Sequence, residues 1–253
     1  MIWVLLIFLF IWPLDGGAKD TLKVAAIDWC PQICPDQKSH PGYLVEILRA
    51  VFDDSPYEVR MDYLSWSSAI TKVQRGQYDI LLSPAKSEAP QLIYHAEPIS
   101  QQMHCLWHLK SYPGKIKKPE DLKKIRFVIY RDHSLPEALG EVLKTPSGHL
   151  SLNYDHDYLE RAIRLLRKNR AQAFVFTAQS VQYHLKKNKI TDIKQGVCFR
   201  KDDLWFGITP VPDPRIANLI KHIDSRLGTF KRSVEYQKIL LKYDIQFPEL
   251  TPW

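Results

Sequence analysis

Four cysteines are the residues whose type and spacing point most directly to chemistry. Cys30 and Cys34 have three residues between them, and a proline follows each of them, which disfavours a helix here. In an exported chain an even cysteine count permits disulfides, and four cysteines allow three pairings. We expect a disulfide between Cys30 and Cys34 that shapes this loop, with a redox pair or a metal site as the alternatives. The spacing is not that of a Cys-x-x-Cys redox motif, and no histidine pair stands nearby to complete a zinc site. The sequence leaves open whether Cys105 and Cys198 pair.

The absence of other motifs argues against several classes of function. The chain carries no Gly-x-Ser-x-Gly motif, no glycine-rich phosphate loop and no metal-ligand spacing, and its 9 histidines are scattered. The net charge of +7 raises the question of nucleic acid, whose phosphates require clustered Lys and Arg. Two short basic runs, Lys115–Lys118 and Lys186–Lys189, are each broken by neutral residues, so we expect them to be solvated surface. We therefore expect no metal, no cofactor and no nucleic-acid partner.

The N-terminus carries the pattern of a signal peptide. Residues Ile2–Trp12 form an unbroken apolar run, which is followed by Gly16, Gly17 and Ala18. This run is too short to span a membrane, which takes roughly 20 residues. We expect residues 1–18 to be removed near Ala18 and the mature protein to be periplasmic. Because no Lys or Arg precedes the run, a retained anchor is the alternative.

The remaining chain reads as an α/β protein. With 253 residues, 45% of them hydrophobic and 25% charged, it can bury a full core as one large domain or two lobes. Apolar periodicity predicts a first set of alternating elements: a strand at Leu22–Ile27, a helix at Tyr43–Phe52, a strand at Tyr57–Tyr63, a helix from Trp66 to Gly76 and a strand at Tyr78–Leu82.

A second α/β set follows, and the chain then returns to a final strand and two helices. The second set comprises a strand at Ile125–Tyr130, a helix capped at Ser134, a strand at Leu150–Asn153, a helix at Tyr158–Lys168, a strand at Ala173–Phe176 and a helix at Gln179–Lys187. The return comprises a strand at Leu204–Thr209 and helices at Pro214–Leu227 and Val234–Tyr243. Two sets with a C-terminal return predict two lobes and a cleft.

Several segments, in this order and spacing, resemble the family 3 extracellular solute-binding proteins of amino-acid-type ABC transporters. Pro41–Ile47, Trp66–Ile70 and Arg75–Ile80 resemble the first lobe of that family. The second lobe and the return resemble it at Asp121–Lys124, Arg170–Phe176, Leu204–Ile208 and Glu235–Ile239. Each motif is weak alone, but together they span nearly all of the mature chain.

The resemblance implies a two-lobed type II periplasmic-binding-protein fold with two hinge crossovers, near Glu97–Gln102 and Arg200–Phe206. Residues 19–98 would form the first part of lobe one, residues 99–203 lobe two, and residues 204–253 the return to lobe one. A small-molecule ligand would bind between the lobes, and hinge closure would present the complex to a membrane permease or receptor. We expect a monomer and no enzymatic activity.

The resemblance also implies ligand-binding positions. Trp29 and Trp66 match aromatic positions that stack the ligand, with core or lobe packing as the alternative for each. Ser83 and Lys86 match a loop that meets the ligand's polar head, although Lys86 also reads as a surface lysine. Arg131 matches a position that is often polar or basic, next to the helix expected at Ser134.

Two departures from the family pattern concern the ligand. Amino-acid binders of the family hold the α-carboxylate with an Arg a few residues after the Ser83 loop, and Ser87–Leu92 contains no Arg. They hold the α-ammonium with an acidic residue after a second-lobe strand, where this chain has Thr177. We therefore expect a small polar or anionic ligand, with Lys86 or Arg131 accepting the anion, and not an α-amino acid bound in the usual way.

Two alternatives remain open in the sequence. Some proteins that resemble this family are exported dehydratases of cyclic prephenate-like acids, and Asp28 or Glu88 would then supply the proton. A solvated loop charge is the simpler interpretation of Glu88, and a loop cap that of Asp28. The other alternative is a free-standing sensor or scaffold module.

Overall fold

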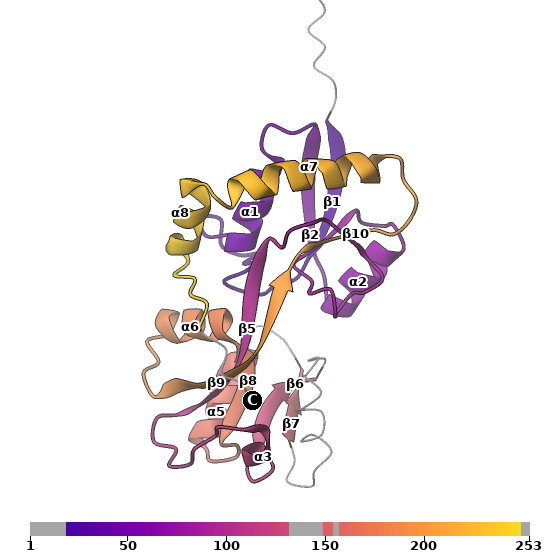
Figure 1. Cartoon of the computed structure of the whole chain (residues 1–253). Coiled ribbons are helices and arrows are strands. Elements are labelled where there is room, and N and C mark those ends of the chain that lie inside the picture. The colour runs from indigo at the N-terminus through magenta and orange to yellow at the C-terminus, as the bar shows by residue number, and fades with distance from the viewer. Residues whose placement is uncertain (1–18, 132–148, 154–156, 249–253) are drawn as a thin grey trace, which may run out of the picture.

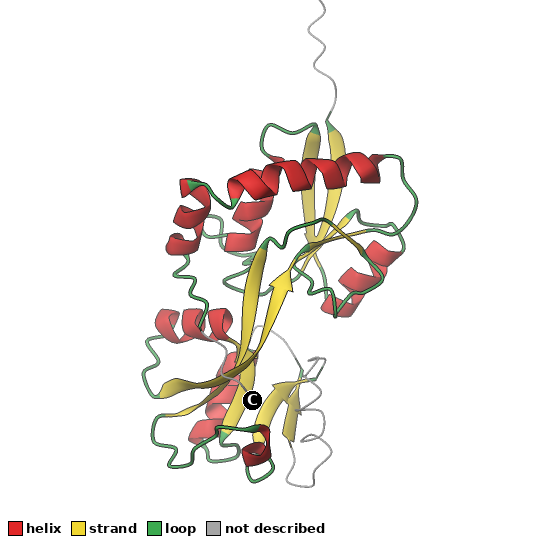
Figure 2. Ribbon diagram, in the orientation of Figure 1, coloured by secondary structure: helices red, strands yellow, loops and turns green. Residues whose placement is uncertain are grey.

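The computed structural model describes residues 19–131, 149–153 and 157–248 (Figure 1). The predicted signal peptide, residues 1–18, and the helix expected at Ser134 lie outside these residues. The described chain forms two lobes, each built on a mixed five-stranded sheet with helices packed against it (Figure 2). The predicted two-lobed α/β architecture is therefore confirmed. Within the described residues, no helix combines the length and the apolar character that crossing a membrane requires.

Lobe one is a sheet in the order β2-β1-β3-β10-β4, with helices on both faces. Its strands are β1 (Asp20–Ala26), β2 (Tyr57–Tyr63), β3 (Ile80–Leu82), β4 (Ile93–Tyr94) and β10 (Phe206–Ile208). Strands β1, β2 and β3 are parallel, whereas β10 is antiparallel to β3 and β4. Its helices are α1 (Tyr43–Phe52), α2 (Trp66–Gln74), α7 (Arg215–Phe230) and α8 (Val234–Lys242).

The alternation of side chains along β1 explains this layering. Leu22 and Val24 point into a core shared with α1, α7 and α8, whereas Ala25 packs on the opposite face with Ala69 and Val73 of α2. In α1 the apolar residues recur at helical spacing, so a single face of the helix covers the sheet. Because β1, β2 and β3 are parallel, their carboxyl ends meet at one edge of the sheet.

Lobe two is a sheet in the order β7-β6-β8-β5-β9. Its strands are β5 (Ser100–Leu109), β6 (Phe127–Tyr130), β7 (His149–Leu152), β8 (Ala173–Thr177) and β9 (Ile193–Leu204), and its helices are α3 (Pro119–Leu122), α5 (Tyr158–Arg167) and α6 (Ala178–Lys187). Strand β6 is parallel to β7 and β8, and β5 is antiparallel to β8 and β9.

The long antiparallel pair β5 and β9 joins the lobes (Figure 1). Ile99 N–H donates to Leu204 O at 2.8 Å, and the pairing starts at Ser100 opposite Leu204. Cys105 and Cys198, whose pairing the sequence left open, form a buried disulfide between these strands. These two strands, which we call the hinge strands, are thus tied to each other covalently within lobe two.

The strand expected at Leu204–Thr209 is divided between the lobes. Leu204 ends β9 in lobe two, and Phe206 begins β10 in lobe one. Trp205 lies between them, and its N–H donates to Pro84 O at 3.1 Å while its carbonyl accepts from Ser83 N–H at 3.0 Å. The chain therefore changes sheets at Trp205, where the loop after β3 holds it.

Candidate ligand-binding site

A cavity of about 280 Å³ lies between the lobes where several strands end. Its described lining comes from the segments after β1, β2 and β3, from the end of β6 and from the hinge strands. The lining residues are Ile27, Asp28, Trp29, Gln32, Leu64, Ser65, Trp66, Ser67, Ser83, Glu88, Gln102, Tyr130 and Leu204. The carboxyl ends of parallel strands are where open α/β sheets bind ligands, and the volume suits a small metabolite.

The two tryptophans predicted to stack a ligand both line this cavity but differ in their partners. Trp66 opens α2 and packs, half-buried, on the lobe-one cluster around Ala69 and Val73. It has no ring partner within the described part of the chain. Trp29 stacks on Phe176 of lobe two with ring centroids 5.1 Å apart, and it meets Tyr130 edge-on at 5.8 Å. Trp29 therefore packs between the lobes while also bordering the cavity.

The loop that carries Trp29 is a compact turn closed by the expected disulfide of Cys30 and Cys34. Trp29 and Ile33 exchange backbone hydrogen bonds of 2.9 and 3.0 Å across it. Gly42, with φ at 109°, lies against this loop, where a Cβ atom would stand 2.3 Å from the carbonyl oxygen of Gln32. A glycine is required at this close approach.

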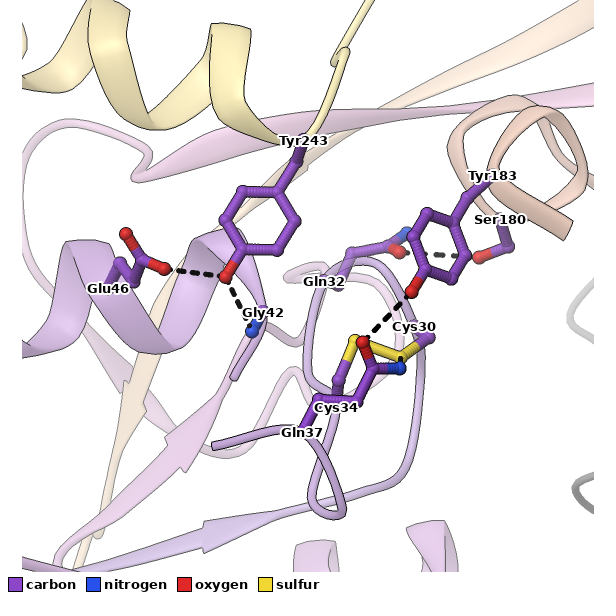
Figure 3. The surroundings of a disulfide bond; sticks show 9 residues. All are labelled: Cys30, Gln32, Cys34, Gln37, Gly42, Glu46, Ser180, Tyr183 and Tyr243. Atoms are coloured by element: carbon purple, nitrogen blue, oxygen red, sulfur yellow. Dashed lines mark hydrogen bonds between the residues drawn. A yellow bond between two sulfur atoms is a disulfide. The ribbon is translucent and has the colours of Figure 1, made fainter. Parts of the chain in front are cut away.

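Figure 3 shows that this disulfide loop contacts α6 of the other lobe. The Tyr183 hydroxyl donates to Gln37 Oε1 at 3.1 Å, and the side chains of Gln32 and Ser180 share a hydrogen bond of 3.3 Å. Together with the rings around Trp29 these contacts form what we call the interlobe latch. Its residues are Trp29, Gln32 and Gln37 of lobe one and Tyr130, Phe176, Ser180 and Tyr183 of lobe two.

The segment after α8 makes a second set of contacts with α6. Asp244 forms an ion pair of 2.8 Å with Lys186, and Gln179 Nε2 donates to the carbonyl of Gln246 at 3.3 Å. Gln179 also accepts from Met103 N–H of the hinge strand at 3.3 Å. Helix α6 is thus held by the disulfide loop, the C-terminal segment and the hinge.

Glu88 places a carboxyl group in the cavity, and the backbone holds one of its oxygens. Ala85 N–H donates to Glu88 Oε2 at 3.0 Å, while Oε1 has no hydrogen-bond partner among the described residues. Burial raises the pKa of Glu88; the Ala85 N–H and the charges of His104 and Arg200 oppose this shift, and Asp202 adds to it. The carboxyl group therefore lacks a compensating cation of its own.

Three nearby hinge residues pair with one another. His104 Nε2 lies 3.0 Å from Asp202, and Arg200 Nε donates to the same carboxylate at 2.7 Å. Although burial pushes the pKa of Asp202 upward, the hydrogen bonds from His104 and Arg200 leave it below its ordinary value. We infer that this cluster is an ion-paired part of the hinge.

Three of the predicted ligand-binding residues lie elsewhere in the structure. Lys86 is exposed, and its Nζ stands 3.7 Å from the ring centroid of Trp205. Arg131 is exposed, with its N–H donating to Leu152 O at 2.7 Å. Thr177 is buried, and its hydroxyl donates to Ser180 at 3.0 Å. None of the three is among the described lining residues, whereas Trp29, Trp66 and Ser83 are.

The sequence does not predict the other ten described lining residues as ligand-binding positions, and three of these are Glu88, Gln102 and Tyr130. Glu88 was considered only as a proton donor, Gln102 only as part of a crossover, and Tyr130 only as the end of a strand. Position at a strand's carboxyl end was the available signal for Tyr130. Within the described ranges, no group of three or more His, Cys, Asp or Glu is placed to hold a metal ion.

Comparisons with known proteins find likeness in structure only. No family model and no curated protein matches the sequence. A histidine kinase sensor domain with similarity to periplasmic binding proteins matches with a TM-score of 0.73 and 20% identity, over 89% of this chain and 96% of that one. The substrate-binding protein of an amino acid ABC transporter matches with a TM-score of 0.67 and 15% identity, over 89% of this chain and 100% of that one.

A third structure is an ancestral amino-acid-binding protein that is a precursor of cyclohexadienyl dehydratase. It matches with a TM-score of 0.69 and 19% identity, over 88% of this chain and 95% of that one. Identities this low carry the fold and not the ligand or the activity. The chain has the two-lobed fold of type II periplasmic binding proteins, as its sequence motifs predicted.

Proposed function

We propose that this protein is a monomeric periplasmic solute-binding protein that captures one small polar molecule between its lobes. The observation that carries the proposal is the cavity at the strand ends, which both lobes and both hinge strands line. A ligand there touches both lobes, so its binding favours the closed form over an open one. The closed complex would be recognised by a membrane permease, for uptake, or by a receptor, for sensing.

The lining also bears on the class of ligand. No Arg occurs in Ser87–Leu92, and Thr177 lies outside the described lining, so the usual clamps on an α-amino acid are absent from these positions. Lys86 and Arg131, which were expected to accept an anion, lie outside the described lining as well. The lining therefore favours a small polar solute over an anion.

A thermal-shift screen of residues 19–253 tests this function. The screen would cover amino acids, oligopeptides, polyamines, organic acids and sugars. A ligand at 100 times its Kd stabilises the folded state by about 2.7 kcal/mol, which raises the Tm of a protein of this size by about 5–10 °C. Trp66→Ala should reduce the shift, because Trp66 borders the cavity. A flat screen across every class would count against the proposal.

One observation favours a second candidate, an exported dehydratase of prephenate-like acids. Glu88 combines a place in the cavity with a raised pKa, as a general acid requires. Turnover of prephenate that disappears in Glu88→Gln would support the enzyme. Wild-type protein without turnover would exclude it for this substrate.

A further inference from the structure

We propose that the ligand of the interlobe cavity is a small organic cation without a carboxylate group, and that Glu88 selects it. The inference rests on the solute-binding function proposed above. It adds the chemical class of the ligand and the residue that recognises its charge.

The charges in the lining give the first argument. Two described lining residues carry a carboxyl group, Asp28 and Glu88, and none of the described lining residues carries a basic side chain. Transferring an ion from water into a cavity is unfavourable unless a group of opposite charge meets it there. A cation meets the carboxylate of Glu88 in this lining, whereas an anion would be repelled by it.

The geometry of Glu88 gives the second argument. One carboxylate oxygen is fixed by Ala85 N–H at 3.0 Å, and the other has no partner among the described residues. The basic groups whose charges reach it, His104 and Arg200, are both bound to Asp202. A ligand N–H group would therefore supply the hydrogen bond and the positive charge that this carboxylate lacks.

The aromatic walls give the third argument. Rings of Trp29, Trp66 and Tyr130 line the same cavity. Aromatic faces attract cations and also pack against apolar groups. A ligand that carries an amine or guanidine group on a small apolar frame could therefore contact both the aromatic rings and the carboxylate. A volume of about 280 Å³ restricts the frame to a small one.

The same features disfavour binding of the amino acid that differs from such an amine only by an added carboxylate group. Its carboxylate would enter a cavity that already holds Asp28 and Glu88, and the described lining offers no basic side chain to receive it. Pairs of compounds that differ only in this carboxylate therefore separate the two ligand classes.

Isothermal titration with such pairs tests the inference, using tyramine against tyrosine and agmatine against arginine. We expect at least one amine to bind about 10-fold or more tightly than its amino acid. We expect Glu88→Gln to weaken that amine about 10- to 100-fold, the range for a lost charge-assisted hydrogen bond. The control is Glu97→Gln, which removes the same charge from an exposed residue outside the described lining.

A second measurement does not depend on a variant. Because the pKa of Glu88 is raised, cation binding should release protons, which titrations in buffers of different ionisation enthalpy detect. Asp28, His104, Arg200 and Asp202 are the other titratable or charged groups near this carboxyl, and the last three pair with one another. Proton uptake on binding would contradict the inference.

The outcomes distinguish a failure of this inference from a failure of the proposed solute-binding function. Amines that bind tightly and depend on Glu88 support both. Amino acids or acids that bind more tightly than the amines, or an unchanged amine affinity in Glu88→Gln, overturn the inference and leave the solute-binding function standing. No binding by any class in titration or thermal shift overturns both.

Discussion

The interlobe latch predicts that the protein closes before any ligand arrives, and Trp29→Ala is the change that tests this. The indole of Trp29 makes two ring contacts with lobe two, at 5.1 and 5.8 Å. Aromatic pairs contribute about 0.5–1.5 kcal/mol each, so removing both weakens the closed form by about 1–3 kcal/mol. The ratio of open to closed molecules should then rise about 5- to 150-fold.

Single-molecule energy transfer measures this ratio directly, because it counts minor populations. Dyes placed at the exposed positions Arg75, after α2, and Arg164, on α5, would report the separation of the lobes. We expect ligand-free wild type to be mainly closed and ligand-free Trp29→Ala to show a larger open population. The ligand is left out because Trp29 also borders the cavity.

Trp66→Ala is the matched control for this experiment. It removes the same side chain from the same cavity, but Trp66 packs on lobe one and has no ring partner in the described residues. We expect its ligand-free population to match wild type. The latch reasoning is refuted if Trp29→Ala gives the wild-type distribution, or if Trp66→Ala opens the protein equally.

Three further predictions concern stability. Glu88→Gln should raise the Tm of the ligand-free protein at pH 8 and leave it nearly unchanged at pH 4, because the raised pKa makes the charged carboxyl unfavourable in the folded state as pH rises. Thermal melts at both pH values measure this, and an equal gain at pH 4 would contradict it. His95 should make the protein sensitive to acid, because burial lowers its pKa to about 4 from 6.5 while its Nε2 accepts from Phe206 N–H at 3.1 Å. Stability should fall by up to about 3 kcal/mol as pH drops through this interval, and His95→Gln should reduce that slope in urea unfolding. Replacing Cys105 and Cys198 together by alanine should lower the free energy of unfolding by about 4–5 kcal/mol, because the bridge joins residues 93 positions apart. Urea denaturation checks this value, and a loss as small as that from replacing Cys30 and Cys34, whose loop is short, would contradict it.

The helices and the parallel strands were predictable from the sequence because each buries one regular apolar face. The hinge strands were not. Strand β5 contains Gln101 and His104, and β9 contains a run of charged residues, so neither reads as a buried strand. Polar groups of the two strands pair with each other, as in the hydrogen bond of Gln101 to Asp203 at 3.0 Å and the 3.0 Å contact of His104 with Asp202. Polar residues whose partners lie about 100 residues away in the sequence cannot be recognised as part of a buried strand from their own segment alone.

The candidate site was predictable in part for the same reason. The family resemblance implied Trp66 and Ser83, and the local patterns that predict β2 and β3 place both residues after the ends of these strands. The position of Lys86 depends on Trp205, which the hinge brings over it from far along the chain. The partners of Trp29 come from lobe two, so its double role could not be derived from its own segment.

The insertion of one lobe into the other has a consequence for the order in which the protein assembles. Every strand of the second sheet lies within the continuous segment Ser100–Leu204. The first sheet needs β10, which pairs with β3 on one side and β4 on the other and is synthesised after that segment. Until Phe206–Ile208 arrives, β3 has an open edge and β4 has no neighbour in its sheet. The inserted lobe can therefore fold first, and the lobe that begins the chain is completed last.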